Sequence, residues 1–180
     1  MQHLPQPRQR PRTLVHPGIP SPIRINSRRA PSARHFRILL APGLSLIEAF
    51  VEALRPLDVK SASATLIGGS FSPLVYFVGR KDESKRALFT YSAPINAGSS
   101  RMLSGSATFG TALSGDPIVH CHATFLTEIA DVRGGHIVPE QSIVDAPITL
   151  LVTSLDAFEV RQAHDPETNV PLLQPFEVQS

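Results

Sequence analysis

The stretch HCHATFLTEIADVRGGHI, residues 120–137, decides how this chain is expected to fold and what it is expected to bind. It places two of the seven histidines one residue apart, and a third directly after a pair of glycines. On a β-strand, successive side chains point to opposite faces of the sheet. If residues 118–126 form a strand, His120 and His122 share one face, and Cys121 lies on the apolar face that suits a core.

The third histidine can reach the first two through a hairpin. His136 follows His122 by 14 residues, enough for the strand to end, turn over residues 128–133 and return alongside. The glycine pair at 134–135 can adopt backbone angles closed to other residues and leaves room for neighbouring imidazoles. Together with His120, three neutral imidazoles predict a site for Zn²⁺ or a similar divalent ion. A fourth position stays open to water, a substrate oxygen or a group from another chain.

A competing interpretation is a set of solvated or hydrogen-bonded histidines on a polar sheet face. It is the better explanation for one histidine alone. Three histidines on one predicted hairpin favour a metal site made by His120, His122 and His136. Cys121 is not expected to be a fourth ligand, because strand alternation turns it into the core, where a free cysteine is common.

Length and composition predict a single domain with a hydrophobic core. The chain has 180 residues, of which 42% are hydrophobic, and its one cysteine excludes an internal disulfide framework and favours a reduced compartment. No apolar run approaches the roughly 18 residues that a membrane helix needs. The Arg- and Pro-rich start has no apolar segment of the kind that secretory signals carry. We therefore expect a soluble, cytoplasmic protein without a membrane partner.

The charges are distributed unevenly along the chain. Residues 1–37 contain eight arginines and no acidic residue, whereas residues 38–180 carry a formal charge of −6. Seven prolines fall within residues 1–34, which show no lasting helical or strand period. We predict a basic, extended or disordered arm over residues 1–34 and one domain over residues 35–180.

The arm is the part of the chain expected to meet DNA. Pro7–Pro11 reads PRQRP, which resembles the Arg-Gly-Arg-Pro core of an AT-hook, a minor-groove binder. Gln9 stands where the hook has glycine, and its side chain obstructs the approach to the groove floor. A non-specific basic arm, or one with no binding role, therefore competes with minor-groove recognition. Any nucleic-acid affinity of such an arm falls steeply with salt.

The pattern of residues 35–180 predicts an α+β fold, a compact single domain of mainly antiparallel β-sheet with one principal helix. Ser45 stands three residues before Glu48, the spacing of a capping box, so a helix is expected to start there and to end near Pro56. Asp82–Arg86 is expected to be a polar turn. The predicted strands are residues 36–40, 62–67, 74–78, 88–91, 101–109, 118–126, 136–138, 148–154 and 158–161.

These residues also resemble a known family, the PPC ("plants and prokaryotes conserved") domain, in its prokaryotic type. The family pattern is a His-x-His strand, an acidic turn and then Gly-Gly-His, and it matches residues 120, 122 and 134–136. The resemblance covers about residues 37–178. Further matching segments are residues 41–53, 62–71, 103–105, 165–168 and 172–173.

The resemblance implies a compact α+β domain, a homotrimer, and a zinc-type metal on the three histidines close to a subunit boundary. In the plant AT-hook nuclear-localised proteins, hooks bind AT-rich DNA and the domain serves oligomerisation and partner binding. The chain departs from the pattern at three places. Residues 96–101, NAGSSR, replace the plant partner-binding segment, the turn at 128–131 lacks the usual Asp-Gly pairing, and the hook-like segment has Gln9.

Two functions follow from these observations. The first is a DNA-binding or assembly module, a homotrimer with a three-His zinc site and basic arms. The alternative is a zinc-dependent enzyme, a hydrolase or lyase acting on a small carbonyl or ester ligand at the open metal position. The PPC fold resembles that of acetolactate decarboxylase, which holds zinc with three histidines. An enzyme also needs a general acid or base, for which Glu128, Glu140, Arg161 and His164 are candidates by chain proximity alone.

Overall fold

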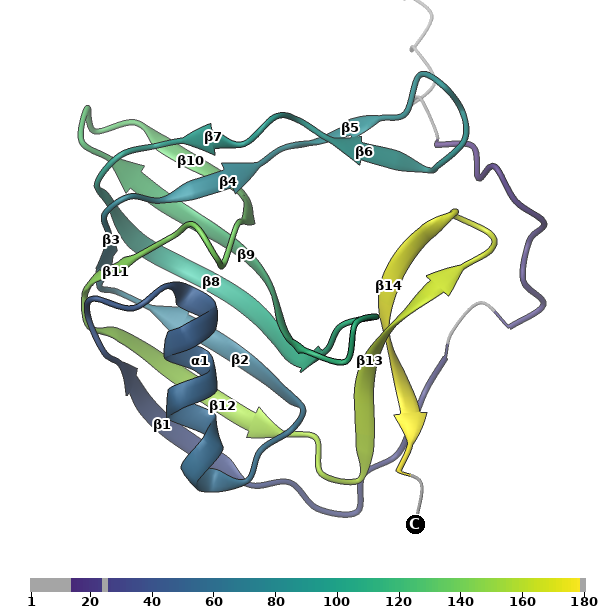
Figure 1. Cartoon of the computed structure of the whole chain (residues 1–180), viewed down its shortest axis with the longest axis horizontal. Coiled ribbons are helices and arrows are strands. Elements are labelled where there is room, and N and C mark those ends of the chain that lie inside the picture. The colour runs from purple at the N-terminus through teal and green to yellow at the C-terminus, as the bar shows by residue number, and fades with distance from the viewer. Residues whose placement is uncertain (1–13, 24–25, 179–180) are drawn as a thin grey trace, which may run out of the picture.

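A twisted, mostly antiparallel β-sheet dominates the computed structural model, which describes residues 14–23 and 26–178 (Figure 1). Its main path of strands runs β1-β12-β2-β8-β9-β10-β4-β7, with β3, β11, β13 and β14 attached to it. The elements are, in chain order, β1 (His35–Leu40), α1 (Leu46–Leu54), the 3₁₀ turn η1 (Arg55–Leu57), β2 (Ala62–Ile67), β3 (Ser70–Phe71), β4 (Val75–Phe77), β5 (Gly79–Lys81), β6 (Phe89–Tyr91), β7 (Ile95–Asn96), β8 (Ser100–Thr111), β9 (Pro117–Thr127), β10 (Val132–Ile137), β11 (Val144–Ala146), β12 (Ile148–Ser154), β13 (Phe158–Asp165) and β14 (Val170–Glu177). The predicted α+β class is confirmed.

Helix α1 begins where the sequence predicts. The Ser45 side chain accepts a hydrogen bond from the Glu48 backbone N–H, and the Glu48 carboxylate accepts one from the Ser45 backbone N–H, which completes a capping box. The helix buries Leu46 and Phe50 against one face of the sheet, and Phe50 stacks on Phe109 of β8 at 6.3 Å between ring centroids. No helix among the described residues has the length and apolar character required to cross a membrane.

The two faces of the sheet differ in chemistry, and this difference positions the histidines. The face under α1 is apolar, and β9 contributes Val119, Cys121, Ala123 and Phe125 to it. The opposite face, which we call the outer face, carries mainly Ser, Thr and His side chains along β2, β8 and β9. The alternation predicted for residues 118–126 is therefore confirmed.

Two hairpins extend beyond the main sheet (Figure 1). One is β5–β6, whose connection contains the predicted polar turn, and the other is β13–β14. They meet where the Leu88 backbone N–H donates to the carbonyl of Thr168 over 2.8 Å, and the Asn169 side chain donates to the carbonyl of Arg86. The hydrogen bonds join the far ends of both hairpins, so each limits the movement of the other.

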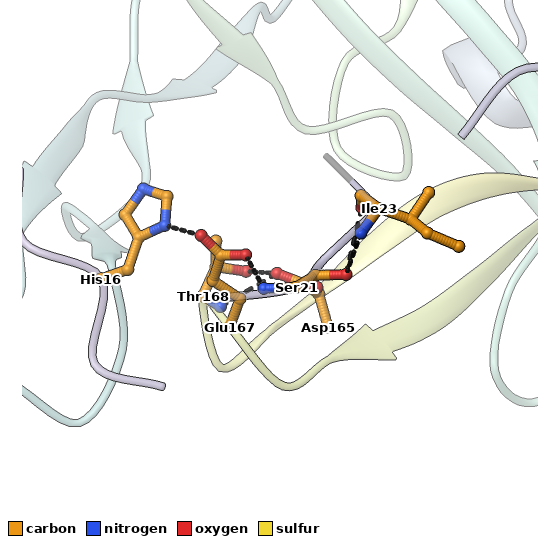
Figure 2. A network of polar contacts seen from close by, with 6 residues as sticks. All are labelled: His16, Ser21, Ile23, Asp165, Glu167 and Thr168. Carbon is orange, nitrogen blue, oxygen red and sulfur yellow. Dashed lines mark hydrogen bonds and ion pairs between the residues drawn. The ribbon is translucent and has the colours of Figure 1, made fainter. Parts of the chain in front are cut away.

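Residues 14–23 lie against the turn between β13 and β14. Figure 2 shows the Glu167 carboxylate in contact with His16 Nδ1 and with the Ser21 backbone N–H, each over 2.6 Å. The Gly18 backbone N–H donates to the Glu167 carbonyl over 2.9 Å. A Cβ at Gly18 would lie 1.9 Å from the carbonyl oxygen of Pro166, so only glycine fits there. This part of the arm is thus fastened to the domain, whereas the hook-like Pro7–Pro11 lies outside the described residues.

Candidate metal centre

The hairpin of β9 and β10 brings the three predicted histidines together. On β9, His120 and His122 lie on the outer face, opposite Thr108 and Ser106 of β8. On β10, His136 lies directly opposite His122. The turn between these strands spans residues 128–131 and is shorter than predicted, because β10 begins at Val132.

The three imidazoles converge on one point. Their ring centroids are 4.9 Å apart for His120 and His122, 4.7 Å for His120 and His136, and 5.1 Å for His122 and His136. One nitrogen from each ring lies within 4.8 Å of the other two. A tetrahedral ion with Zn–N bonds of 2.0–2.1 Å needs nitrogens about 3.4 Å apart, a change that rotation of the side chains supplies. The cluster could therefore hold a metal ion, and metal binding itself stays a prediction.

The surroundings keep the rings of His120 and His136 in the form that binds metals. Burial, together with the nearby charges of His120 and His122, lowers the pKa of His136 to about 4. Burial also lowers the pKa of His120, with a contribution from His122. Both rings are neutral at pH 7, and a neutral imidazole has the lone pair that a metal requires. Little proton release is thus needed when these two rings take a metal.

Two aromatic side chains support His136. Tyr91 Oη lies 3.4 Å from His136 Nδ1, and the two ring centroids are 5.0 Å apart. The Phe77 ring lies 6.2 Å from that of His136 and stacks on Tyr91. A contact to Nδ1 leaves Nε2 of His136 to face the other histidines, an arrangement typical of metal-bound histidine.

The glycine pair acts differently from the prediction. Neither Gly134 nor Gly135 has a positive φ, so neither is required for its backbone angles. A Cβ at Gly135 would lie 2.6 Å from both the carbonyl oxygen of Phe77 and the ring of Tyr76. At Gly134 the nearest atom is the carbonyl oxygen of Ala123, at 3.2 Å. The expectation that the pair leaves room for imidazoles was wrong, since the space at Gly135 is used by strand β4.

The remaining candidates lie away from the cluster. Cys121 is fully buried, and burial raises the pKa of its thiol to about 12, so the prediction that it is a core residue is confirmed. None of the suggested acids and bases lines the cavity that adjoins the histidines. These four residues are Glu128, Glu140, Arg161 and His164.

A cavity of about 640 Å³ opens beside His120 and His136. Hairpin β5–β6 supplies Phe89 and Tyr91 to its wall, and β14 supplies residues 170–173. No local pattern predicts this arrangement, because the wall comes from segments that are distant in the chain and carry no motif. Tyr91 and the residues of β14 were therefore missed as part of the site.

Several known structures share this arrangement of strands. No protein-family model and no curated protein sequence matches the chain. A PPC protein from Pyrococcus horikoshii superposes with a TM-score of 0.59 at 18% identity, covering 82% of this chain and 93% of that one. The chain has the PPC fold.

Two further structures share the PPC fold with this chain. A metal-containing protein from Archaeoglobus fulgidus has a TM-score of 0.61 at 19% identity, over 83% of this chain and 98% of that one. A candidate DNA-binding protein from Ralstonia eutropha JMP134 has a TM-score of 0.60 at 19% identity, over 76% of this chain and 88% of that one. At these identities the comparison establishes the PPC fold and leaves the activity to be argued from the site.

Proposed function

We propose that this chain is a PPC-domain protein of the prokaryotic type, a metal-binding assembly module with a basic arm for DNA. The observation that carries the proposal is the convergence of His120, His122 and His136 from two strands onto one point. Zinc suits three neutral imidazoles and an open fourth position. Two proteins with this fold, one described as metal-containing and one as a candidate DNA-binding protein, support both parts of the proposal. The single cysteine, with its unreactive thiol, favours action in the cytoplasm.

The outer face of the sheet supports assembly into a homotrimer. Leu39, Ile67 and Leu151 are 63%, 46% and 44% exposed, although all three belong to strands of the main sheet. Leu151 lies in the same row of cross-strand neighbours as His122, and Ile67 lies in the row next to it. Large apolar side chains gathered on one face, among small Ser and Thr residues, are typical of a surface that another subunit covers. The metal site then lies next to the subunit contact.

The arm supplies the DNA-binding part of the proposal. The domain is acidic, with a formal charge of −6 over residues 38–180, so it does not attract phosphate groups. The eight arginines of residues 1–37, in contrast, attract phosphate groups. A trimer presents three arms, and their effective concentration strengthens contacts that are weak one at a time.

The cavity beside the histidines favours a second function, a zinc-dependent enzyme. An open metal position next to a walled space is the arrangement that metallohydrolases and lyases use. Among the described residues that line this space, however, none is Asp, Glu or Lys, so Tyr91 and the histidines are the groups there that can transfer a proton. The assembly module therefore remains the preferred function.

Metal analysis of the purified protein together with its mass in solution tests the proposal. Wild type is expected to contain one zinc per chain and to have the mass of a trimer. His120→Ala combined with His136→Ala is expected to lose the zinc, and Leu151→Glu is expected to dissociate the trimer. Leu113→Glu, which adds the same charge at an exposed turn, is the control and is expected to remain trimeric. A metal-free wild type, or zinc retained by the double variant, overturns the site.

The arm is tested separately in the full-length chain. Replacing Arg8, Arg10 and Arg12 with Gln is expected to weaken binding to duplex DNA and to lower the slope of log affinity against log salt by about 3. DNA binding that is unchanged in this variant, or that does not depend on salt, rejects the role of the arm without affecting the metal site.

A further inference from the structure

We propose that the cavity beside the histidines binds a small carboxylate whose remaining body is apolar. The inference rests on the metal site proposed above and adds the chemical class of its ligand. The cavity volume of about 640 Å³ falls within the roughly 300–1,000 Å³ typical of small-molecule sites.

The cavity is held in shape by hydrogen bonds at some distance from the histidines. Its wall consists of β6 on one side and of β13 and β14 on the other, with β8 and β9 as the floor. The turn that follows β13 fixes both sides, because the Thr168 carbonyl accepts from Leu88 N–H and the Asn169 side chain donates to Arg86. The Asp165 carboxylate accepts from the Thr168 N–H and hydroxyl, which keeps this turn folded. The space is therefore a built feature and not a gap between loose hairpins.

The charge in the cavity selects the head group of the ligand. Of the described residues that line it, none is Asp, Glu, Lys or Arg. A divalent ion on three neutral histidines keeps its full charge of +2, because no protein carboxylate reduces it. In surroundings of low polarity, an anion at the open position is strongly favoured over a neutral group. A carboxylate supplies oxygen ligands of the kind that zinc accepts.

The rest of the wall selects the body of the ligand. Apolar groups predominate, with Phe89, Ile118, Val170 and Leu172 placed around the space next to His120. The polar side chains among its lining residues are uncharged and include Thr108 and Gln162. Such a wall binds an alkyl or branched body by burial of apolar surface, and it offers no partner for a second charge.

Binding of a carboxylate with an apolar body can be tested with a series of carboxylates on the protein loaded with Co²⁺. The visible absorption of Co²⁺ reports a change of ligand at the metal. Acetate, butanoate and hexanoate are titrated by absorption and by calorimetry, with hexanamide as the neutral counterpart of hexanoate. Affinity is expected to rise by up to about fourfold for each added methylene. Hexanamide is expected to bind at least tenfold more weakly than hexanoate.

A pair of variants locates the ligand. Gln162→Glu places a negative charge in the wall with almost no change of shape, and is expected to weaken hexanoate binding about fivefold or more. Gln141→Glu makes the same change at an exposed turn outside the cavity and is expected to leave the affinity within twofold of wild type.

The possible outcomes separate the two proposals. Failure of the wild type to take up Co²⁺ or Zn²⁺ overturns the metal site and the ligand together. Metal uptake with hexanoate no tighter than acetate, or no tighter than hexanamide, overturns the ligand class alone. Metal uptake with absorption that no carboxylate changes shows that the open position is filled by the protein itself or by another subunit, and it too overturns the ligand class.

Discussion

Replacement of Gly135 with Ala is expected to damage the metal site without touching a histidine. The added Cβ would lie 2.6 Å from the carbonyl oxygen of Phe77 and 2.6 Å from Cδ2 of Tyr76. Ordinary van der Waals contact needs about 3.5 Å, so strand β10 must move from β4 by roughly 0.9 Å. His136 is the next residue and pairs with Phe77, so it moves with the strand.

The size of the effect follows from the tolerance of zinc coordination. Metal–ligand distances must hold to about 0.2 Å, and a displacement of nearly 1 Å exceeds what one side chain recovers without strain. Loss of a group that positions a ligand costs about 10–100-fold in metal affinity. We expect the zinc affinity of Gly135→Ala to fall within that range, and its stability without metal to fall by about 1–3 kcal/mol from overpacking.

Gly134→Ala is the matched control, since it adds the same methyl group one residue earlier, on the other face. Its Cβ would lie 3.2 Å from the carbonyl oxygen of Ala123, which needs a shift of only a few tenths of an ångström. Competition for zinc against a chromophoric chelator measures both variants, and circular dichroism shows that each is folded. Equal affinities for Gly135→Ala and wild type would show that the close contact between β10 and β4 does not position His136, as would an equal loss in the two variants.

Three further predictions concern features outside the metal site. Cys121 is expected to react with iodoacetamide at pH 8 at least about 10³-fold more slowly in the native protein than in urea, because burial raises its thiol pKa to about 12, and rapid native labelling would contradict its place in the core. Gly18→Ala is expected to speed hydrogen exchange at the Ser21 amide without changing the melting temperature of the domain. Gly79→Ala, the control, adds a Cβ that has nothing within 4 Å, so it is expected to change neither quantity. An unchanged exchange rate at Ser21 in Gly18→Ala would count against the fastening of residues 14–23 to the domain. Ser45→Ala is expected to lower the free energy of unfolding by about 1 kcal/mol in urea denaturation, and no loss would show that the capping box contributes nothing.

Much of the fold could be predicted because its signals are local. Residues 62–67 and 148–154 were predicted as strands and are β2 and β12, where alternation and turn residues mark both ends. Strand β14 was missed, because Pro171 and Pro175 lie within it and proline argues against a strand by removing a backbone donor. The other missed strands, β3, β5, β7 and β11, have only two or three residues, too few to show a period.

In the candidate site, too, the features that follow from local sequence patterns could be predicted, and those that depend on tertiary contacts could not. The approach of His120 and His122 follows from the period of a single strand, and the approach of His136 follows from the hairpin. The support from Tyr91 comes from β6, which is 45 residues away from His136 in the sequence, and no local pattern announces such a contact. The requirement for glycine at position 135 also comes from a tertiary neighbour, because strand β4, and not an imidazole, occupies the place that a Cβ would take.

The three histidines differ in the way strand pairing holds them. His120 and His122 lie in the middle of β9, which pairs with β8 along almost its whole length, so their positions are fixed by the sheet. His136 lies near the end of β10, where pairing with β4 involves only that residue and Ile137. His136 also pairs with His122 of β9, so both neighbouring strands hold its backbone, and its side-chain neighbours Tyr91 and Phe77 complete its positioning. Because Tyr91 also belongs to the wall of the cavity, a ligand that presses on this wall acts on His136 through the contact between Tyr91 Oη and His136 Nδ1.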